Sequence, residues 1–235
     1  MKLNNLIITI FSIFLLFLSP IAVSDDSGSV SQIIDSTNVH YSRHYERSRG
    51  ATVKITTPSG GHGTGTYIRH NGVYGILTAA HVVTQGQIFL IDGAGQQNLG
   101  ALVWIDNEAD LAFLVTNEIA GLNSLRIAAS PQIKAGDVIV YSGYPSSHEM
   151  LTFACTIANA NYSGKLMIQG YAWFGASGSG FINSRGKVVG VLSAVSVENF
   201  FGHPQVLETL VYGAPLTSQH IEQIEAVTTK LKENR

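Results

Sequence analysis

Residues 63–79 read GTGTYIRHNGVYGILTA and contain the clearest turn signal in the chain. Asn71-Gly72 is the strongest short signal for a two-residue β-hairpin turn, because both residues readily adopt the positive φ angles that such a turn requires. The residues on either side are mostly strand-forming types, so we predict one antiparallel strand before the turn and one after it. The stretch indicates an antiparallel β protein.

Short runs of strand-forming residues continue along the rest of the chain. They lie at residues 51–57, 87–92, 101–106, 111–115, 137–145, 150–160, 165–173, 178–184, 187–197 and 209–215. With the two strands of the hairpin they make about twelve, and a softer stretch from Asn117 to Ala135 divides these into two equal groups. We therefore predict an all-β fold with two six-stranded antiparallel β-barrels packed side by side, at about residues 50–120 and 133–215.

The C-terminal segment changes to a helical pattern. Apolar residues recur there at helical spacing: Ile221, Ile224, Val227 and Leu231. Thr217 or Ser218 would serve as the N-cap, and Lys230 and Lys232 near the end suit the helix dipole. We predict a C-terminal α-helix at about residues 217–233.

The N-terminus has the pattern of a secretory signal peptide. Lys2 precedes 13 uncharged residues from Leu6 to Leu18, and the small residues of Ala22-Val23-Ser24 follow. An uncharged run of this length is typical of a signal peptide and is shorter than the roughly 20 residues that span a bilayer. We predict a signal peptide at residues 1–24, cleaved near Ser24, and a secreted or periplasmic product with no stable membrane span. An uncleaved anchor is the alternative.

Residues 25–48 are polar and predict an N-terminal arm before a domain at residues 49–235. His40 and His44 in this arm are four residues apart and could share a helical face. A metal site needs further ligands, and none accompanies them, so a solvated face is the better interpretation. We expect no metal and no other cofactor.

Composition bears on partners and on redox chemistry. The net charge is −2 and no cluster of Lys or Arg occurs along the chain, which argues against nucleic acid as a partner. Cys155 is the only cysteine, so no internal disulfide can form, and its apolar neighbours predict a buried thiol. An intermolecular disulfide is the alternative. The sequence does not indicate an oligomeric state.

Three segments each place a reactive side chain beside small residues. His81 follows two alanines in LTAAHVV, Asp110 heads the apolar run of NEADLAFLV, and Ser177 lies near glycines in FGASGSGFI. Taken singly, each has an ordinary interpretation: a capping or core histidine, a turn aspartate and a flexible turn. Together they are the groups that nucleophilic catalysis needs, since a serine hydroxyl is a weak nucleophile until a base accepts its proton.

In this chain order the three segments resemble the signatures of trypsin-like serine proteases: a T-A-A-H box, an acidic residue heading a D-L-A strand, and a G-x-S-G turn. The resemblance covers roughly residues 51–232, with GHGTGTYI before the His box and GSGFINSRGKVVGV from residue 178 onwards. It implies a catalytic triad of His81, Asp110 and Ser177.

The resemblance also selects among neighbouring candidates. Asp106 competes with Asp110, and Ser179 competes with Ser177, but the family spacing favours Asp110 and Ser177. The backbone N–H groups of Gly175 and Ser177 are expected to form the oxyanion hole.

The expected substrate contacts follow the same resemblance. The fragment from residue 192 to 195 resembles the strand whose backbone pairs with substrate, so Ser193, Ala194 and Val195 are expected to bind it. The pocket for the residue before the scissile bond is expected near Tyr171. No Asp or Glu occurs between residues 165 and 197, which favours small or medium uncharged side chains in that pocket.

One departure from the family pattern concerns activation. Many members carry Asp at the position of Ala176, where it binds the amine of a newly cleaved N-terminus, so this chain is more similar to bacterial and viral members without that Asp. We predict a secreted serine endopeptidase that hydrolyses proteins or peptides through an acyl-enzyme. The alternatives are a catalytically silent homologue that binds a peptide or a surface, and an esterase.

Overall fold

The hairpin around Asn71 forms as predicted. The computed structural model describes residues 42–146 and 148–234, with the backbone alone at residue 200. Asn71 and Gly72 have φ angles of 48° and 78°, and they join β2 (His62–His70) to β3 (Val73–Thr78). The pairing starts at His70 opposite Val73 and runs to Thr66 opposite Leu77.

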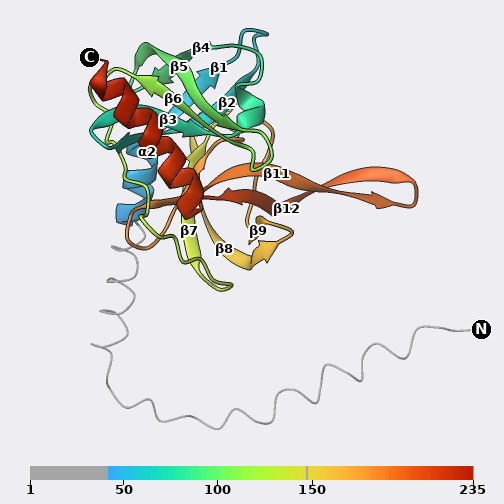
Figure 1. Ribbon diagram of the computed structural model, residues 1–235. Coiled ribbons are helices and arrows are strands. Elements are labelled where there is room, and N and C mark those ends of the chain that lie inside the picture. Colours follow the sequence, from blue (N-terminus) through green and yellow to red (C-terminus); the bar gives the residue numbers. More distant parts are fainter. Residues whose placement is uncertain (1–41, 147, 235) are drawn as a thin grey trace, which may run out of the picture. The chain divides into compact units, whose positions relative to one another are not determined.

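Six antiparallel strands close the first barrel in the order β1-β2-β3-β6-β5-β4 (Figure 1). Besides β2 and β3 they are β1 (Thr52–Thr56), β4 (Ile88–Gly93), β5 (Gln96–Asp106) and β6 (Leu111–Thr116). Large buried side chains such as Phe89 and Phe113 fill the interior. Gly75 is needed on β3, because a Cβ there would collide with the ring of Phe113.

A second closed barrel follows, in the order β10-β11-β12-β9-β8-β7. Its strands are β7 (Val138–Gly143), β8 (Leu151–Tyr162), β9 (Lys165–Gln169), β10 (Gly180–Ile182), β11 (Val188–Phe200) and β12 (His203–Pro215). Four of its apolar residues, Ile182, Val188, Val191 and Ala214, belong to the same buried cluster as the core of the first barrel. The predicted fold of two six-stranded antiparallel barrels packed together is confirmed.

The predicted C-terminal helix is also present, as α2 (Ser218–Glu233). Thr217 is its N-cap: the Thr217 hydroxyl accepts the His220 N–H, and the His220 ring accepts the Thr217 N–H. The helix buries Ile221 and Ile224, which join the core cluster of the first barrel. Burial of this face holds the helix against the domain.

Part of the expected N-terminal arm lies within the described residues, and it is helical over residues 42–50. His44 and Ser48 are buried there. The Ser48 hydroxyl accepts a hydrogen bond from Ser142 on β7, and the Ser48 carbonyl accepts one from Thr52 on β1. These bonds link the helix to both barrels. His40, the other member of the weighed histidine pair, lies outside the described residues.

The β11–β12 hairpin is longer than the sequence indicated. We expected strands at residues 187–197 and 209–215, but β11 runs to Phe200 and β12 begins at His203. Phe201 and Gly202, with φ angles of 52° and 83°, form the turn. Gly202 and Pro204 are residues typical of loops, and for that reason the pattern gave no signal for the outer part of the hairpin. Figure 1 shows this hairpin extending beyond the barrel.

Within the part of the chain that the structure describes, no helix is both long and apolar enough to cross a membrane. The predicted signal peptide at residues 1–24 lies outside that part.

We predict that the Cys155 thiol does not react with a maleimide at pH 8 while the protein is folded. Cys155 is buried as expected, and burial raises the pKa of its thiol to about 11, although a backbone hydrogen bond from Tyr171 lowers it. The thiolate is the reactive form, so both access and ionisation are suppressed. Mass spectrometry should find no adduct until urea unfolds the chain. Rapid labelling of the folded protein, or a dimer that a reducing agent dissociates, would contradict the prediction.

Candidate active site

His81 and Asp110 lie side by side at the ends of two paired strands. His81 follows β3 in a 3-10 turn (Ala80–Val82), Asp110 directly precedes β6, and Thr78 on β3 pairs with Ala112 on β6. The His81 Nδ1 atom is 3.0 Å from each carboxylate oxygen of Asp110, and the His81 backbone N–H donates to Oδ1 at 3.0 Å. Because a carboxylate only accepts, Nδ1 carries the proton of the neutral ring and leaves Nε2 as its acceptor.

The Asp110 carboxylate has a third donor from the second barrel, the hydroxyl of Ser193 on β11. Burial by itself raises the pKa of Asp110, but the hydrogen bonds from the His81 ring, the Ser193 hydroxyl and the His81 backbone outweigh it, so the pKa lies below the ordinary value of 3.8. Asp110 has a φ of 61°, in the left-handed region, which aspartate tolerates better than most residues. Its carboxylate is therefore ionised and held in place at neutral pH.

Ser177 lies in the turn that leads into β10. Gly175 and Gly178 on either side have φ angles of 94° and 93°. A Cβ on Gly178 would collide with the Thr64 carbonyl oxygen and the Thr78 hydroxyl, and a Cβ on Gly175 with the His62 ring. Both positions require glycine, for backbone conformation and for space.

Two backbone N–H groups of this turn are free to bind a ligand. The Phe174 carbonyl accepts a hydrogen bond from the Ser146 N–H, and in a trans peptide the Gly175 N–H points the opposite way from that carbonyl. Among the described residues, neither the Gly175 N–H nor the Ser177 N–H donates to any protein acceptor. Paired free donors beside a serine hydroxyl suit a negatively charged oxygen.

Thr64 on β2 binds this turn with its N–H and its hydroxyl. Its N–H donates to the Ser177 carbonyl at 2.8 Å, and its hydroxyl donates to the Gly175 carbonyl at 2.8 Å. The same hydroxyl accepts the Tyr144 N–H at 3.1 Å, and the Thr64 carbonyl accepts the Thr78 hydroxyl at 2.7 Å. Sequence reasoning missed Thr64. Its only signal was its place in the glycine-rich strand GHGTGTYI, which does not distinguish Thr64 from Thr66.

The structure brings Ser177 towards the His81–Asp110 pair through neighbouring groups. Gly178 donates its N–H to the Leu192 carbonyl at 2.8 Å, next to Ser193, which binds Asp110. Among the described residues the Ser177 hydroxyl makes no hydrogen bond to His81. Such bonds are often long in a free enzyme and tighten when substrate binds.

With this geometry in hand, comparison with known proteins identifies the family. A family model for the trypsin-like peptidase domain matches residues 63–191, more than half of the chain, and the match includes His81, Asp110 and Ser177. The chain belongs to the trypsin-like peptidase family. The family expected from the sequence is thereby confirmed.

Two peptidases illustrate how distant the similarity is. The chain is 27% identical over 148 residues to the periplasmic pH-dependent serine endoprotease DegQ of Escherichia coli strain K12, covering 59% of this chain and 32% of DegQ. The chain thus spans about a third of the length of this relative. The crystal structure of a serine endoprotease from Yersinia pestis matches with a TM-score of 0.62 at 22% identity, over 83% of this chain and 65% of that one. This second likeness concerns the fold.

The residues expected to bind substrate occupy different environments in the peptidase domain. Ser193 is buried and its hydroxyl binds Asp110, a contact that the sequence did not indicate. Ala194 is exposed, and Val195 packs against the core of the second barrel. Tyr171 is half-buried beside the ring of Phe153, and its carbonyl accepts a hydrogen bond from the buried Tyr141 hydroxyl. Tyr171 is thus fixed on the second barrel.

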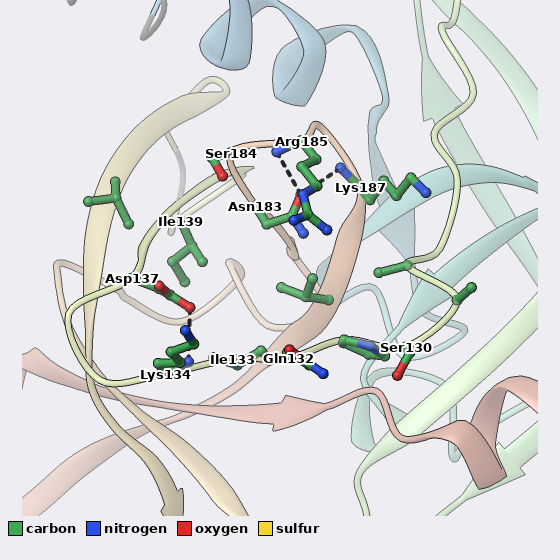
Figure 2. A pocket seen from close by; sticks show the side chains of 15 residues that line it. Ser130, Gln132, Ile133, Lys134, Asp137, Ile139, Asn183, Ser184, Arg185 and Lys187 are labelled. Carbon is green, nitrogen blue, oxygen red and sulfur yellow. Dashed lines mark hydrogen bonds between the residues drawn. The ribbon is translucent and has the colours of Figure 1, made fainter.

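A hollow of about 600 Å³ lies elsewhere on the peptidase domain (Figure 2). It is bounded by residues 128–134, the start of β7 and the turn at residues 183–187, in which the Asn183 side chain accepts the backbone N–H groups of Arg185 and Lys187. Ser177 precedes β10 and this turn follows β10, so they lie at opposite ends of that strand. No predicted site residue lines the hollow, and it is separate from the candidate active site.

We predict that Gly178→Ala lowers the free energy of unfolding by about 3 kcal/mol or more, because the added Cβ meets Thr64 and Thr78 in a packed site. Gly136→Ala is the matched control: Gly136 has a φ of 90°, and a Cβ there meets nothing within 4 Å. Strain alone should cost the control about 1–2 kcal/mol. Urea unfolding measures both values, and equal losses would show that the contact with Thr64 is unimportant.

We predict that Asp110 stabilises the fold at neutral pH and stops doing so in acid. Its folded pKa lies below the unfolded value of 3.8, so its contribution is complete above about pH 4 and is lost as the pH falls through the folded pKa. The difference in unfolding free energy between wild type and Asp110→Asn should therefore shrink below pH 4. Ser193→Ala, which removes one donor, should reduce that pH dependence. A difference that grows towards low pH would contradict the lowered pKa.

Proposed function

We propose that the protein is a secreted serine endopeptidase that uses His81, Asp110 and Ser177. The observation that carries the proposal is the orientation of the His81 ring, whose Nδ1 lies 3.0 Å from both carboxylate oxygens of Asp110, in a chain of the trypsin-like peptidase family. This pairing leaves Nε2 as an acceptor, which is what a general base for serine requires.

The reaction proceeds in two acyl-transfer steps, following the general Ser-His-Asp template. The Ser177 hydroxyl oxygen attacks the carbonyl carbon of the scissile peptide while His81 Nε2 takes its proton. His81 then returns that proton to the leaving amine, the C–N bond breaks, and an ester to Ser177 remains. Water then attacks the ester with His81 again as the base; His81 returns the proton to the Ser177 oxygen as the C–O bond breaks, which releases the carboxylic acid and restores the free serine. Asp110 keeps the proton on Nδ1 and stabilises the imidazolium that forms in each step.

The negative oxygen of each tetrahedral intermediate is bound by the N–H groups of Gly175 and Ser177. One donor of this kind typically contributes about 3 kcal/mol to transition-state stabilisation. The peptide planes of these two N–H groups are held through their carbonyls: the Ser146 N–H donates to the Phe174 carbonyl, and the Ser179 N–H donates to the Ala176 carbonyl at 3.1 Å.

Activation does not depend on a newly cleaved N-terminus. Ala176, which stands where many relatives have Asp, is buried and offers no carboxylate to a terminal amine. Burying an ammonium there without a counter-charge would be strongly unfavourable. The hydrogen bonds made by Thr64 and Ser146 shape the turn instead, so the enzyme is competent once the signal peptide is removed.

Substrates are proteins or peptides outside the cytoplasm. The uncharged run from Leu6 to Leu18 supports export, and DegQ is a periplasmic endoprotease. The absence of Asp and Glu between residues 165 and 197 favours an uncharged residue before the scissile bond.

We predict that a fluorophosphonate probe labels the folded protein once, at Ser177. Ser177→Ala should abolish both labelling and peptide hydrolysis. Ser179→Ala is the control for the competing serine, whose buried hydroxyl donates to the Ala176 carbonyl, and it should keep both. Asp110→Asn should remain folded and lower kcat by about 10⁴, as the wrong imidazole tautomer does in the template enzyme.

Intact-mass measurement and hydrolysis of a quenched peptide library give the readouts. A folded protein that neither labels nor cleaves any peptide would favour the silent, peptide-binding homologue. Labelling with hydrolysis of small esters but of no peptide would favour the esterase.

A further inference from the structure

The outer part of β11 has one unpaired edge. Inside the barrel, β10 pairs with β11 as far as Val191, and β12 pairs with the other side. Between Ser193 and Phe200, only β12 pairs with β11 among the described residues. Figure 1 shows this stretch running out along the projecting hairpin. An unpaired edge presents N–H and C=O groups to which an extended chain can add.

The hairpin turn determines which backbone groups face this edge. Phe200 and His203 flank a two-residue turn and so form a hydrogen-bonded pair, after which hydrogen-bonded and non-hydrogen-bonded pairs alternate. Asn199 and Pro204 then form a non-hydrogen-bonded pair, which agrees with the lack of an N–H on Pro204. The N–H and C=O groups of Val197 and Asn199 therefore point away from β12, towards the free edge.

The same edge continues back to the candidate active site. The pairing shifts between Leu192 and Ala194, which marks a β-bulge at Ser193. Leu192 already bonds to the backbone of residues 178 and 179, and the bulge lets the next residue, Ser193, face the same side. A second register shift follows between Val195 and Ser196, where β12 has three additional residues, 208–210. β11 itself is unbroken there, so Ser193, Val195 and Val197 follow one another in steps of two. The edge thus extends from the residue that binds Asp110 to the tip of the hairpin.

The base of the hairpin is bonded to the segment that leads to Ser177. The carbonyls of Glu208 and Thr209 on β12 accept the N–H groups of Ala172 at 3.0 Å and Gly170 at 3.2 Å. A chain paired along β11 is therefore held at a defined distance from the Ser177 turn.

Apolar side chains lie exposed along this hairpin. Val197, opposite Val206 on β12, is 58% exposed, and Phe201 at the tip is 100% exposed. Exposed apolar residues next to an unpaired edge favour an extended partner that carries apolar side chains of its own.

The family resemblance implies that residues 193–195 pair with the substrate; we propose that the outer part of this edge, at Val197 and Asn199, extends that pairing along the segment on the N-terminal side of the scissile bond. The proposal rests on the proposed peptidase function. With the first residue before the scissile bond opposite Ser193, the third lies opposite Val195, the fifth opposite Val197 and the seventh opposite Asn199. The enzyme thus selects unfolded segments that stay extended for about seven residues before the cleaved bond, with an apolar fifth residue beside Val197.

A series of quenched peptides tests this directly. The peptides share one cleavage site and carry three, five or seven residues before it. For the wild-type protein, kcat/KM should rise about tenfold from the shortest to the longest, as expected for a few added backbone hydrogen bonds. A rate independent of length would overturn the proposal.

A shortened hairpin provides the matched variant. Ser196 and Leu207 form the same type of pair as Phe200 and His203, so residues 197–206 can be replaced by Asn-Gly without altering the pairing below. This variant should cleave the three-residue peptide like wild type and gain nothing from added length. If it kept the full gain, the hairpin would not be the binding edge.

Backbone methylation of the substrate separates pairing from simple contact. N-methylation of the fifth residue removes an N–H that faces Val197 and should cancel most of the gain, whereas N-methylation of the sixth, whose N–H faces away, should not. Equal effects would overturn the proposal.

Two further outcomes distinguish failure of this inference from failure of the proposed peptidase function. Fluorophosphonate labelling at Ser177 with no length dependence, together with a dimer that the shortened variant loses, would mean that a second copy occupies the edge. Absence of both labelling and cleavage would overturn the peptidase function itself and this inference with it.

Discussion

The carboxylate of Asp110 binds groups from both barrels, and the candidate active site depends on this. His81 donates to it from the first barrel and Ser193 from the second. Thr64 makes the reciprocal link, from β2 of the first barrel to the Ser177 turn of the second. Apolar packing holds the barrels together elsewhere but tolerates small shifts, whereas these directional bonds do not. Charge and hydrogen bonding thus fix the positions of His81, Asp110 and the Ser177 turn relative to one another more closely than apolar packing alone would.

Local signals in the sequence predicted the helices and strands well, but they did not predict the contacts between distant segments. The turn at Asn71-Gly72 and the N-cap at Thr217 each depend on a few adjacent residues, and both formed as expected. The hydrogen bond from Ser193 to Asp110 joins residues 83 positions apart, and no local pattern separates Ser193 from Ser196. The outer hairpin was missed for a related reason. Proline has no N–H, so Pro204 fits into β12 only because it forms a non-hydrogen-bonded pair with Asn199, and the type of that pair depends on how the two strands are aligned.

Charge gives a further example of what the linear sequence hides. We predicted no nucleic-acid partner because no cluster of basic residues occurs along the chain, and this stays a prediction. The fold nevertheless gathers Arg43, Arg47, Arg126, Arg185 and Lys187 around a single hollow on the surface. These residues come from three separate parts of the chain, the helix before the first barrel, the segment between the barrels and the turn after β10, and Glu46 is the one acidic residue among the described residues that line the hollow. The local electrostatic potential therefore depends on how the fold brings these parts together.

The alternating pairing of β11 with β12 also bears on how this protein could change during evolution. Removing or inserting two residues in each strand leaves hydrogen-bonded pairs hydrogen-bonded and non-hydrogen-bonded pairs unchanged. A change of one residue in each strand would exchange the two types, and the backbone groups that now face the free edge would face β12. The hairpin lies beyond the barrel, so such changes in length need not disturb the buried core. The reach of the hairpin can therefore vary among descendants in steps of two residues, independently of the chemistry at Ser177.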